Sequence, residues 1–233
     1  MKKVFLNVAV AFGILSFASS CINSGDTSNP MQGALLVSNL SPDAPGVNIS
    51  LNSKSYASNL VYGIYTPYYL QTAGSYNVNV TDASNTNLFS NTITIEPNKY
   101  YSYFVIDSFA HLKYAFMEDK LTTPGSDSVY IRFLHFSPGA GTISLRDSAT
   151  NNFFYTSRNF NDQNSSPANA AFKEIEQRTL TLQLVNINAN GDTIVLASKK
   201  DTLASGHIYT ILAKGFLNGT DTKAFGIGKI QNY

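Results

Sequence analysis

Short runs in which apolar and polar residues alternate follow one another along the chain from Ala34 onward. Alternation with period two turns one set of side chains toward a core and the other toward solvent, and Gly, Pro, Asn or Ser bounds each run. Only residues 169–177 suggest a short helix. The pattern therefore predicts an all-β protein. The predicted strands are residues 34–39, 46–51, 75–80, 91–95, 100–106, 112–117, 129–135, 142–146, 152–156, 179–186, 193–198, 208–213 and 223–230.

The two halves of this pattern resemble each other, which indicates a duplication. Residues 37–42 (VSNLSP) align with 133–138 (FLHFSP), and residues 97–104 (PNKYYSYF) align with 205–212 (SGHIYTIL). Residues 121–127 (LTTPGSD) contain the Pro-Gly pair of a linker. We therefore predict two tandem immunoglobulin-like antiparallel β-sandwich domains, over residues 33–120 and 128–233. In the second, Asn190-Gly191 predicts a type I′ hairpin turn.

The N-terminal segment has the layout of an export signal. Two lysines follow Met1, residues 4–17 are largely apolar, and small residues at 18–20 precede Cys21. This arrangement resembles a bacterial lipobox, in which the cysteine thiol is acylated and becomes the new N-terminus. An ordinary signal peptide and a retained anchor are the alternatives, although the apolar run is shorter than a membrane span of about 20 residues. A lipid on Cys21 also removes the liability of a free thiol.

This interpretation predicts where the protein is held. Residues 1–20 would be the signal peptide, and the polar residues 21–32 would form a flexible tether. The protein would then be a lipoprotein of the bacterial cell envelope that carries palmitate and is attached to the outer membrane through its N-terminal lipid. Asp26 is the only acidic residue just after Cys21, so the sequence leaves the periplasmic and the surface face open.

Composition narrows the classes of partner. Removing residues 1–20 lowers the basic residues from 16 to 14 against 15 acidic ones, a formal charge of −1. Such a chain has no basic field for nucleic acid, so no nucleic-acid partner is predicted. Aromatic residues reach 12 %, with 14 tyrosines and no tryptophan, which suits an all-β extracellular domain. With Cys21 as the only cysteine, disulfides do not stabilise it.

Several motifs are similar to those of a known family. Residues 41–47 (SPDAPGV) resemble the Ser-Pro-Asp-Ala-Pro-x-Val signature of domain of unknown function 4397, a bacterial extracellular module. Residues 68–78 and 206–210 resemble two further segments of that family. The resemblance covers residues 34–118 and, less closely, 128–230, and it implies a sandwich fold without an agreed activity. The family's His before the motif is Asn39 in the first half and His135 in the second, where the Asp is lost.

Candidate catalytic and metal-binding patterns are sparse. His111, His135 and His207 lie in three separate segments, with no zinc-ligand spacing and no nucleophile elbow. Carboxylates are scattered, although a glycosidase pair needs closeness in space only. We therefore predict a protein that is not an enzyme and has no cofactor or metal. In the turn motif of Ser41, Pro42, Asp43 and Pro45, Asp43 is expected to fix the turn by accepting backbone N–H bonds, with a calcium contact as the alternative.

The aromatic segment 62–69 is the best candidate for ligand binding. Tyrosines combine a flat apolar face with a hydroxyl group, which suits stacking on sugars or filling a partner's pocket. Its tyrosines are Tyr62, Tyr65, Tyr68 and Tyr69. The alternative is that they close one end of the sandwich, and the family resemblance at Tyr68 favours that structural role.

A second kind of signal concerns covalent modification. Asp followed by Ser or Thr and a small or aliphatic residue resembles the O-glycosylation sequon of secreted proteins in one group of bacteria. The candidate acceptors are Ser128, Ser148, Thr193 and Thr202, all in the second half. Taken together, the sequence predicts a lipid-anchored envelope protein that acts as a non-catalytic binding or structural surface module with a carbohydrate or protein ligand. A carbohydrate-binding accessory lipoprotein that uses the tyrosine cluster is the alternative.

Overall fold

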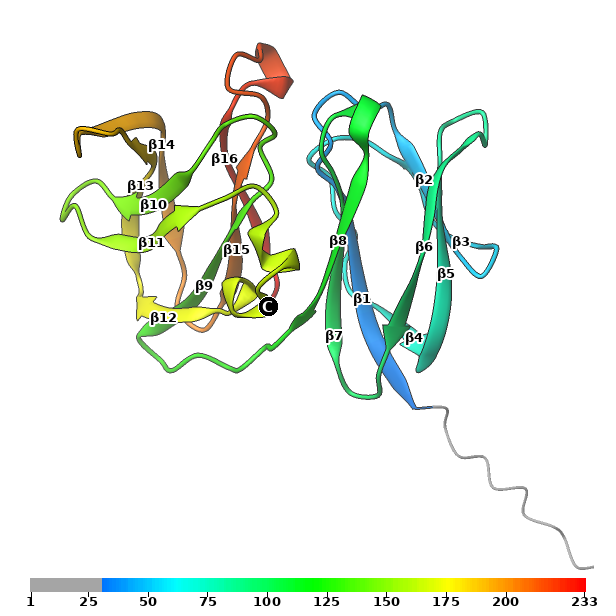
Figure 1. The fold of residues 1–233 in the computed structure, drawn as a ribbon. Helices are drawn as coiled ribbons and strands as arrows, with labels where there is room; N and C mark the ends of the chain where they lie inside the picture. The colour runs from blue at the N-terminus through cyan, green and yellow to red at the C-terminus, as the bar shows by residue number, and fades with distance from the viewer. Residues whose placement is uncertain (1–30) are drawn as a thin grey trace, which may run out of the picture.

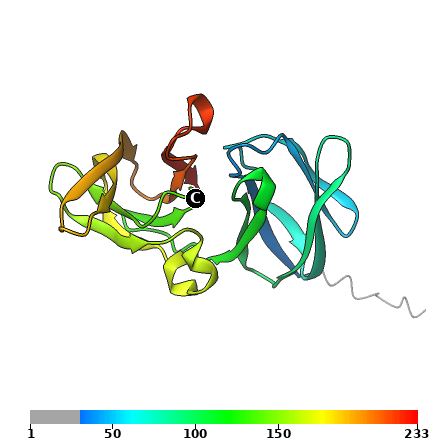
Figure 2. The same cartoon turned by 45° about the horizontal axis from the view of Figure 1, so that its top comes forward.

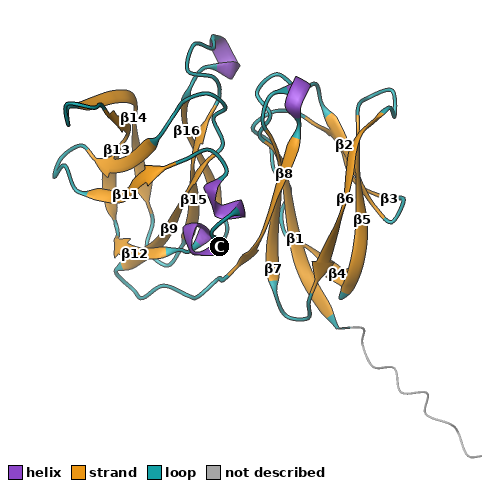
Figure 3. Ribbon diagram, viewed as in Figure 1, coloured by secondary structure: helices purple, strands orange, loops and turns teal. Residues whose placement is uncertain are grey.

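The computed structural model describes residues 31–233, which form two β-sandwiches side by side (Figure 1). The predicted signal peptide, Cys21 and most of the predicted tether lie outside the described residues. Within residues 31–233 the only helices are short 3₁₀ turns at the ends of strands and between the sandwiches (Figure 3). No helix of this part of the chain is long and apolar enough to cross a membrane.

The first sandwich stacks two four-stranded sheets, in the orders β4-β1-β7-β8 and β3-β2-β5-β6. Its strands are β1 (Gln32–Asn39), β2 (Val47–Leu51), β3 (Lys54–Leu60), β4 (Tyr69–Thr72), β5 (Gly74–Thr81), β6 (Asn87–Ile95), β7 (Tyr100–Ile106) and β8 (Lys113–Asp119). The 3₁₀ turn η1 (Phe109–His111) connects β7 to β8. β1 begins inside the predicted tether, at Gln32.

The second sandwich has sheets in the orders β12-β9-β15-β16 and β11-β10-β13-β14. Its strands are β9 (Ser128–His135), β10 (Ile143–Asp147), β11 (Phe153–Arg158), β12 (Lys173–Glu176), β13 (Arg178–Ile187), β14 (Thr193–Leu203), β15 (Ile208–Lys214) and β16 (Gly226–Gln231). Its 3₁₀ turns are η2 (Asp162–Asn164), η3 (Pro167–Ala170) and η4 (Asp221–Lys223).

Both sandwiches share one topology. Adding eight to each strand number of the first gives the order in the second, and the parallel pair β1-β7 recurs as β9-β15. The repeat inferred from the sequence is therefore a repeat of structure. Two tandem sandwiches are confirmed, with four strands in each sheet where a constant-type immunoglobulin domain has four and three.

Each sandwich has its own apolar core between its two sheets. Leu35 and Val37 of β1 face Ile49 of β2 and Val78 of β5 in the first. In the second, Ile131 and Phe133 of β9 occupy the positions equivalent to Leu35 and Val37, and they face Leu145, Leu182 and Leu184. Alternate residues of each strand face this core, because successive side chains of a β-strand point to opposite faces of the sheet.

A third core joins the sandwiches through equivalent faces of their β1- and β9-containing sheets. Figure 2 shows the two bodies adjacent when the molecule is turned. β1, β7, β9 and β15 are consequently buried on both faces, so period two does not describe their burial. This interface core comprises Leu36, Leu40, Phe104, Ile106, Ala115 and Met117 from the first sandwich and Leu134, Phe136, Ala170, Leu212 and Ile230 from the second.

The strand prediction fails mainly at the edges. β3, β4 and β12 were not predicted, and each is the outermost strand of its sheet. The predicted helix at 169–177 is wrong: η3 ends at Ala170, and Lys173–Glu176 pairs with β9 as β12. The predicted hairpin joins β13 and β14, but residues 188–192 form a longer loop than a two-residue turn. Edge strands bury little, so their sequences carry little alternation.

Candidate functional site between the two sandwiches

Arg132 of β9 and Asp119 at the end of β8 meet in the interface between the sandwiches. Arg132 Nη1 lies 2.6 Å from Asp119 Oδ1, and both side chains have 0 % exposure. The two atoms do not align as a hydrogen bond, so their contact is ionic. Phe172 covers the guanidinium with its ring centroid 4.6 Å away. The pair is therefore shielded from solvent. It connects two sandwiches that are joined covalently only by the linker.

Four polar residues close a ring around this ion pair. Arg132 Nη2 donates to Ser102 Oγ (3.3 Å), which donates to Asp119 Oδ2 (2.6 Å). On the other side, Arg132 Nε donates to Thr210 Oγ1 (2.8 Å), which donates to Asn232 Oδ1 (2.6 Å). Asn232 Nδ2 donates to the Tyr68 hydroxyl (2.8 Å), which donates to Asp119 Oδ2 (2.5 Å).

The ring holds the sandwiches in one relative orientation. Tyr68, Ser102 and Asp119 come from the first sandwich, and the other members come from the second. Every hydroxyl both donates and accepts, so the proton order is consistent around the ring. Burial and the neighbouring Asp119 carboxylate raise the pKa of Tyr68, which keeps its hydroxyl protonated as a donor. A buried ion pair does not by itself stabilise a fold, but separating its partners is costly.

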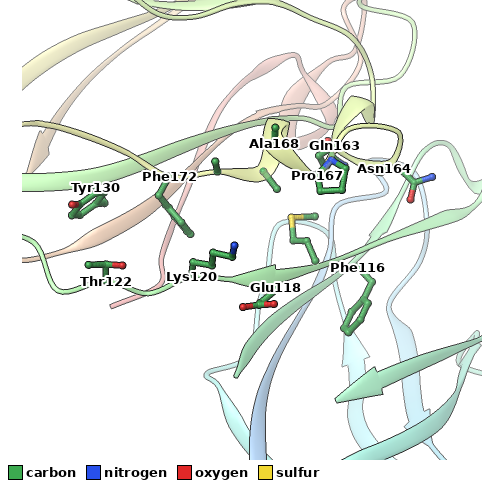
Figure 4. Close-up of a pocket in the computed structure, with 13 residues that line it drawn as sticks. Phe116, Glu118, Lys120, Thr122, Tyr130, Gln163, Asn164, Pro167, Ala168 and Phe172 are labelled. Carbon is green, nitrogen blue, oxygen red and sulfur yellow. The ribbon is translucent and has the colours of Figure 1, made fainter. Parts of the chain in front are cut away.

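A groove of about 630 Å³ lies beside this interface, with walls from both sandwiches (Figure 4). The first sandwich contributes the end of the edge strand β8, and the second contributes the segment from η2 through η3 to Phe172. In Figure 4, Tyr130 and Thr122 lie at one end and Phe116 and Asn164 at the other. Its volume is that of a small-molecule site, and such sites occur preferentially at domain interfaces.

The groove is lined by both apolar and polar side chains. Pro167, Ala168, Ala171 and Phe172 form much of the wall from the second sandwich, opposite Met117 of β8. The polar lining groups are Glu118, Lys120, Thr122, Tyr130, Gln163 and Asn164. Such a surface can hold an apolar body and orient it by a small number of hydrogen bonds and charges.

The predicted tyrosine cluster does not form one platform. The Tyr62 ring lies under Lys214 of the second sandwich, 4.6 Å from its Nζ, and burial raises its hydroxyl pKa. Tyr68 belongs to the buried ring of hydrogen bonds. Tyr65 and Tyr69 are exposed by 39 % and 48 %, and Tyr69 contacts Tyr56 edge-on. Only Tyr65 and Tyr69 therefore offer an open aromatic surface.

The SPDAP turn connects loops at one end of the first sandwich. Asp43 is exposed, and its Oδ1 accepts the backbone N–H of Phe109 at the start of η1 (2.8 Å). It therefore stabilises the neighbouring loop by a backbone bond, whereas its own turn is held by other groups. Ser41 and Pro42 are buried and Pro45 is exposed. The Ser41 N–H donates to Asn39 Oδ1 (3.1 Å).

Asn39 and His135 make equivalent hydrogen bonds to the loops that follow them in the two repeats. Asn39 Nδ2 bonds the carbonyls of Leu60 (3.0 Å) and, six residues on, Pro45 (3.5 Å). His135 Nδ1 faces the N–H of Ser137 (3.3 Å), and its Nε2 faces the carbonyl six residues on, Gly141 (2.8 Å). Burial lowers the pKa of His135, so the neutral ring fills this role. The histidine is thus a loop anchor.

The possible glycosylation acceptors differ in accessibility. Thr193 and Thr202 on β14 are exposed, whereas Ser128 and Ser148 are partly buried. Asp147, the residue before Ser148, is buried and accepts bonds from Ala149 N–H and the Thr150 hydroxyl. Thr193 and Thr202 are therefore the better placed acceptors.

The described residues contain no cluster of three or more His, Cys, Asp or Glu side chains that could hold a metal ion. His111 is exposed in η1, and His207 stacks on Tyr209 at 6.0 Å. The structure does not bring the three histidines together. Within residues 31–233, the buried charged groups are used in pairs and turns rather than aimed into the groove.

Sequence reasoning missed the interface residues Arg132 and Asp119. The available signal was an arginine inside an otherwise apolar strand, because an isolated charge within a buried strand requires a partner. The continuous apolar character of β1, β7, β9 and β15 was a second signal, since strands buried on both faces lose their alternation.

The comparison with protein families matches the part of the chain that contains the turn motif. No curated protein matches the chain. Residues 33–146 match the family described as domain of unknown function (DUF4397). The matched span contains the first sandwich except Gln32 and continues through β9 and most of β10, so it includes both Asp119 and Arg132. Residues 33–146, just under half of the chain, are therefore similar to the DUF4397 family.

Proposed function

We propose that this protein is a lipid-anchored protein of the bacterial cell envelope that acts as a non-catalytic binding module, with the groove between its sandwiches as the binding site. The observation that carries the proposal is that both sandwiches line the groove. Neither domain forms this site alone, and the buried ring around Arg132 and Asp119 fixes its walls. A preorganised site loses less conformational entropy when a ligand binds.

The anchor is supported by the sequence around Cys21 and is tested separately from binding. Cells that express the protein are grown with labelled palmitate, and the label is followed in the wild type and in Cys21→Ser. We expect label in the membrane fraction of the wild type only. Label retained in Cys21→Ser, or an unlabelled wild type released to the periplasm or medium, would contradict the anchor. Protease accessibility in intact cells then distinguishes the surface from the periplasmic face of the outer membrane.

Binding in the groove is tested with a library of fluorinated small molecules observed by ¹⁹F NMR. Ala168 is exposed and lines the groove, so Ala168→Tyr fills it without changing a core residue. We expect most fragments that bind the wild type to lose binding to this variant. Ala83→Tyr, at a similarly exposed position outside the groove lining, is the matched control. Equal binding to the wild type and to Ala168→Tyr would refute the groove as the site.

A carbohydrate-binding role is the second candidate, and two exposed tyrosines support it. Tyr65 follows the exposed Ile64 in the segment before β4, and Tyr69 begins β4 next to the exposed Leu70. An open aromatic surface of this kind can stack on a sugar ring. Glycan-array binding by the wild type that is lost in Tyr65→Ala and Tyr69→Ala, and kept in Tyr114→Ala, would support this role. Binding unaffected by both substitutions would exclude it.

A further inference from the structure

We propose that the interdomain groove binds an organic carboxylate with an elongated apolar body and an N–H or O–H donor at its other end. The inference rests on the proposed binding role of the groove and names the chemical class of its ligand. Three features carry it: an ammonium group without an ion-pair partner, a buried carbonyl oxygen without a donor, and apolar side chains that line the same groove.

Lys120 supplies the positive charge. It directly follows β8, it lines the groove, and it forms no ion pair with any residue in the described span 31–233. The neighbouring lining carboxylate, Glu118, is already bound by Lys99, whose Nζ lies 3.1 Å from Glu118 Oε2. In Figure 4 the Lys120 ammonium lies between the two ends of the groove. The charged lining group without an ion-pair partner is therefore the Lys120 ammonium, and its positive charge favours an anionic ligand group.

Gln163 supplies the hydrogen-bond acceptor. The residue is 5 % exposed and lies in η2 on the opposite wall of the groove. Its Nε2 donates to Asn161 Oδ1 (2.5 Å), which fixes the amide orientation, and its Oε1 has no partner among the described residues. A buried acceptor without a donor is unfavourable. A ligand N–H or O–H that reaches Oε1 would satisfy it.

The walls select the body of the ligand. Met117, Pro167, Ala168 and Phe172 line the groove together with the two polar groups. These apolar side chains can contact an aliphatic chain or an aromatic ring system. Burial of this body supplies affinity, and the two polar groups supply orientation.

The test uses 6-hydroxy-2-naphthoate, which carries a carboxylate and a hydroxyl at opposite ends of a flat apolar body. Its affinity is compared with those of 2-naphthoate, which lacks the hydroxyl, and 2-naphthol, which lacks the carboxylate, by isothermal titration calorimetry. We expect the affinity of the wild type to fall about tenfold when the carboxylate is removed, because it loses a charge-assisted hydrogen bond. A smaller loss is expected without the hydroxyl.

Protein variants assign these contacts to residues. Lys120→Met should weaken 6-hydroxy-2-naphthoate about tenfold and leave 2-naphthol unchanged, while Lys200→Met on β14 serves as the matched surface control. Gln163→Leu should abolish the advantage of 6-hydroxy-2-naphthoate over 2-naphthoate. If Gln163→Leu does not fold, the comparison of these two ligands with the wild type tests the same contact. Lys120 is exposed, so its variant is expected to fold normally.

The outcomes separate this inference from the proposed function. Equal affinity of the wild type for 6-hydroxy-2-naphthoate and 2-naphthol, or an unchanged Lys120→Met, would overturn the carboxylate assignment. If Ala168→Tyr then bound neither 6-hydroxy-2-naphthoate nor 2-naphthol, the groove would still be supported as a binding site. No binding of any of the three probes, combined with fragments that bind equally to the wild type and to Ala168→Tyr, would overturn both proposals.

Discussion

Arg132 and Asp119 lie 13 positions apart in the chain, on either side of the linker, and form a fully buried ion pair across the domain interface. Their side chains point toward each other because β8 and β9 belong to the two sheets whose outer faces pack together. A pair in this position does more than join two residues. It links the two sandwiches beside the groove that Met117 and Pro167 line.

The ion pair predicts a strong effect of single substitutions on stability. Asp119→Ala or Arg132→Ala leaves the other charge buried without a partner, so each should lower the free energy of unfolding by about 3–5 kcal/mol. Urea denaturation followed by circular dichroism measures this loss. The double variant should lose less than the sum of the single variants, because the two residues interact directly. Additive losses, or losses no larger than that of the exposed control Lys54→Ala, would contradict the assignment.

The interface core predicts that the two sandwiches unfold together. A first sandwich produced alone, as residues 31–120, would expose Leu36, Phe104 and Met117 to water. We expect this fragment to bind a hydrophobic dye or to aggregate, whereas the whole protein gives one cooperative transition by differential scanning calorimetry. Two separate transitions of the whole protein, with a fragment that is stable and soluble, would show that the domains are independent.

His135 predicts a loss of stability at mildly acidic pH. Burial lowers its pKa below the value of 6.5 in the unfolded chain, so the unfolded state binds the proton more readily. Stability contributed by the neutral ring is therefore complete above about pH 6.5 and declines as the pH falls toward the folded-state pKa. Once protonated, Nδ1 could no longer accept the hydrogen bond from the N–H of Ser137.

His135→Asn tests this explanation, because Asn39 fills the equivalent place in the first repeat. The melting temperature of this variant should change less between pH 7.5 and pH 5 than that of the wild type. His111→Asn, in the exposed turn η1, is the control and should keep the wild-type dependence. A variant at position 135 with an unaltered pH dependence would exclude His135 as its source.

Asp43 predicts a loop contact rather than a calcium site. Asp43→Ala removes the acceptor of the Phe109 N–H and should cost about 1 kcal/mol of stability, and Asp43→Asn should retain most of it. Adding millimolar Ca²⁺ should leave the melting temperature of the wild type unchanged. A calcium-dependent rise that disappears in Asp43→Asn would support the ligand interpretation.

The sequon matches predict that the exported protein carries glycans. The protein is exported in a bacterium that glycosylates such sequons, and its intact mass should exceed that of lipid plus polypeptide. Thr193→Val or Thr202→Val should remove part of the excess mass. Ser148→Ala should have a smaller effect, because Asp147 is buried in its turn. A mass equal to lipid plus polypeptide would rule out the modification.

The sequence by itself determined the local and repeated features of this protein. Alternation located most strands, the aligned segments revealed the duplication, and residues 41–47 identified the DUF4397 family. These features are readable because each depends on residues near one another in the chain. The edge strands β4 and β12 were not predicted, because they form by pairing with β1 and β9, which are far away in the sequence.

Only the tertiary structure decided how the two sandwiches meet. The sequence makes Tyr68 a candidate for ligand binding with a structural role as the alternative, and docking of the domains buries its hydroxyl between Asp119 and Asn232. Alternation records which face of a strand is apolar, but it does not record which surface covers that face. That choice depends on the relative position of two folded bodies, and hence the groove beside Lys120 and Gln163 exists only in the assembled pair.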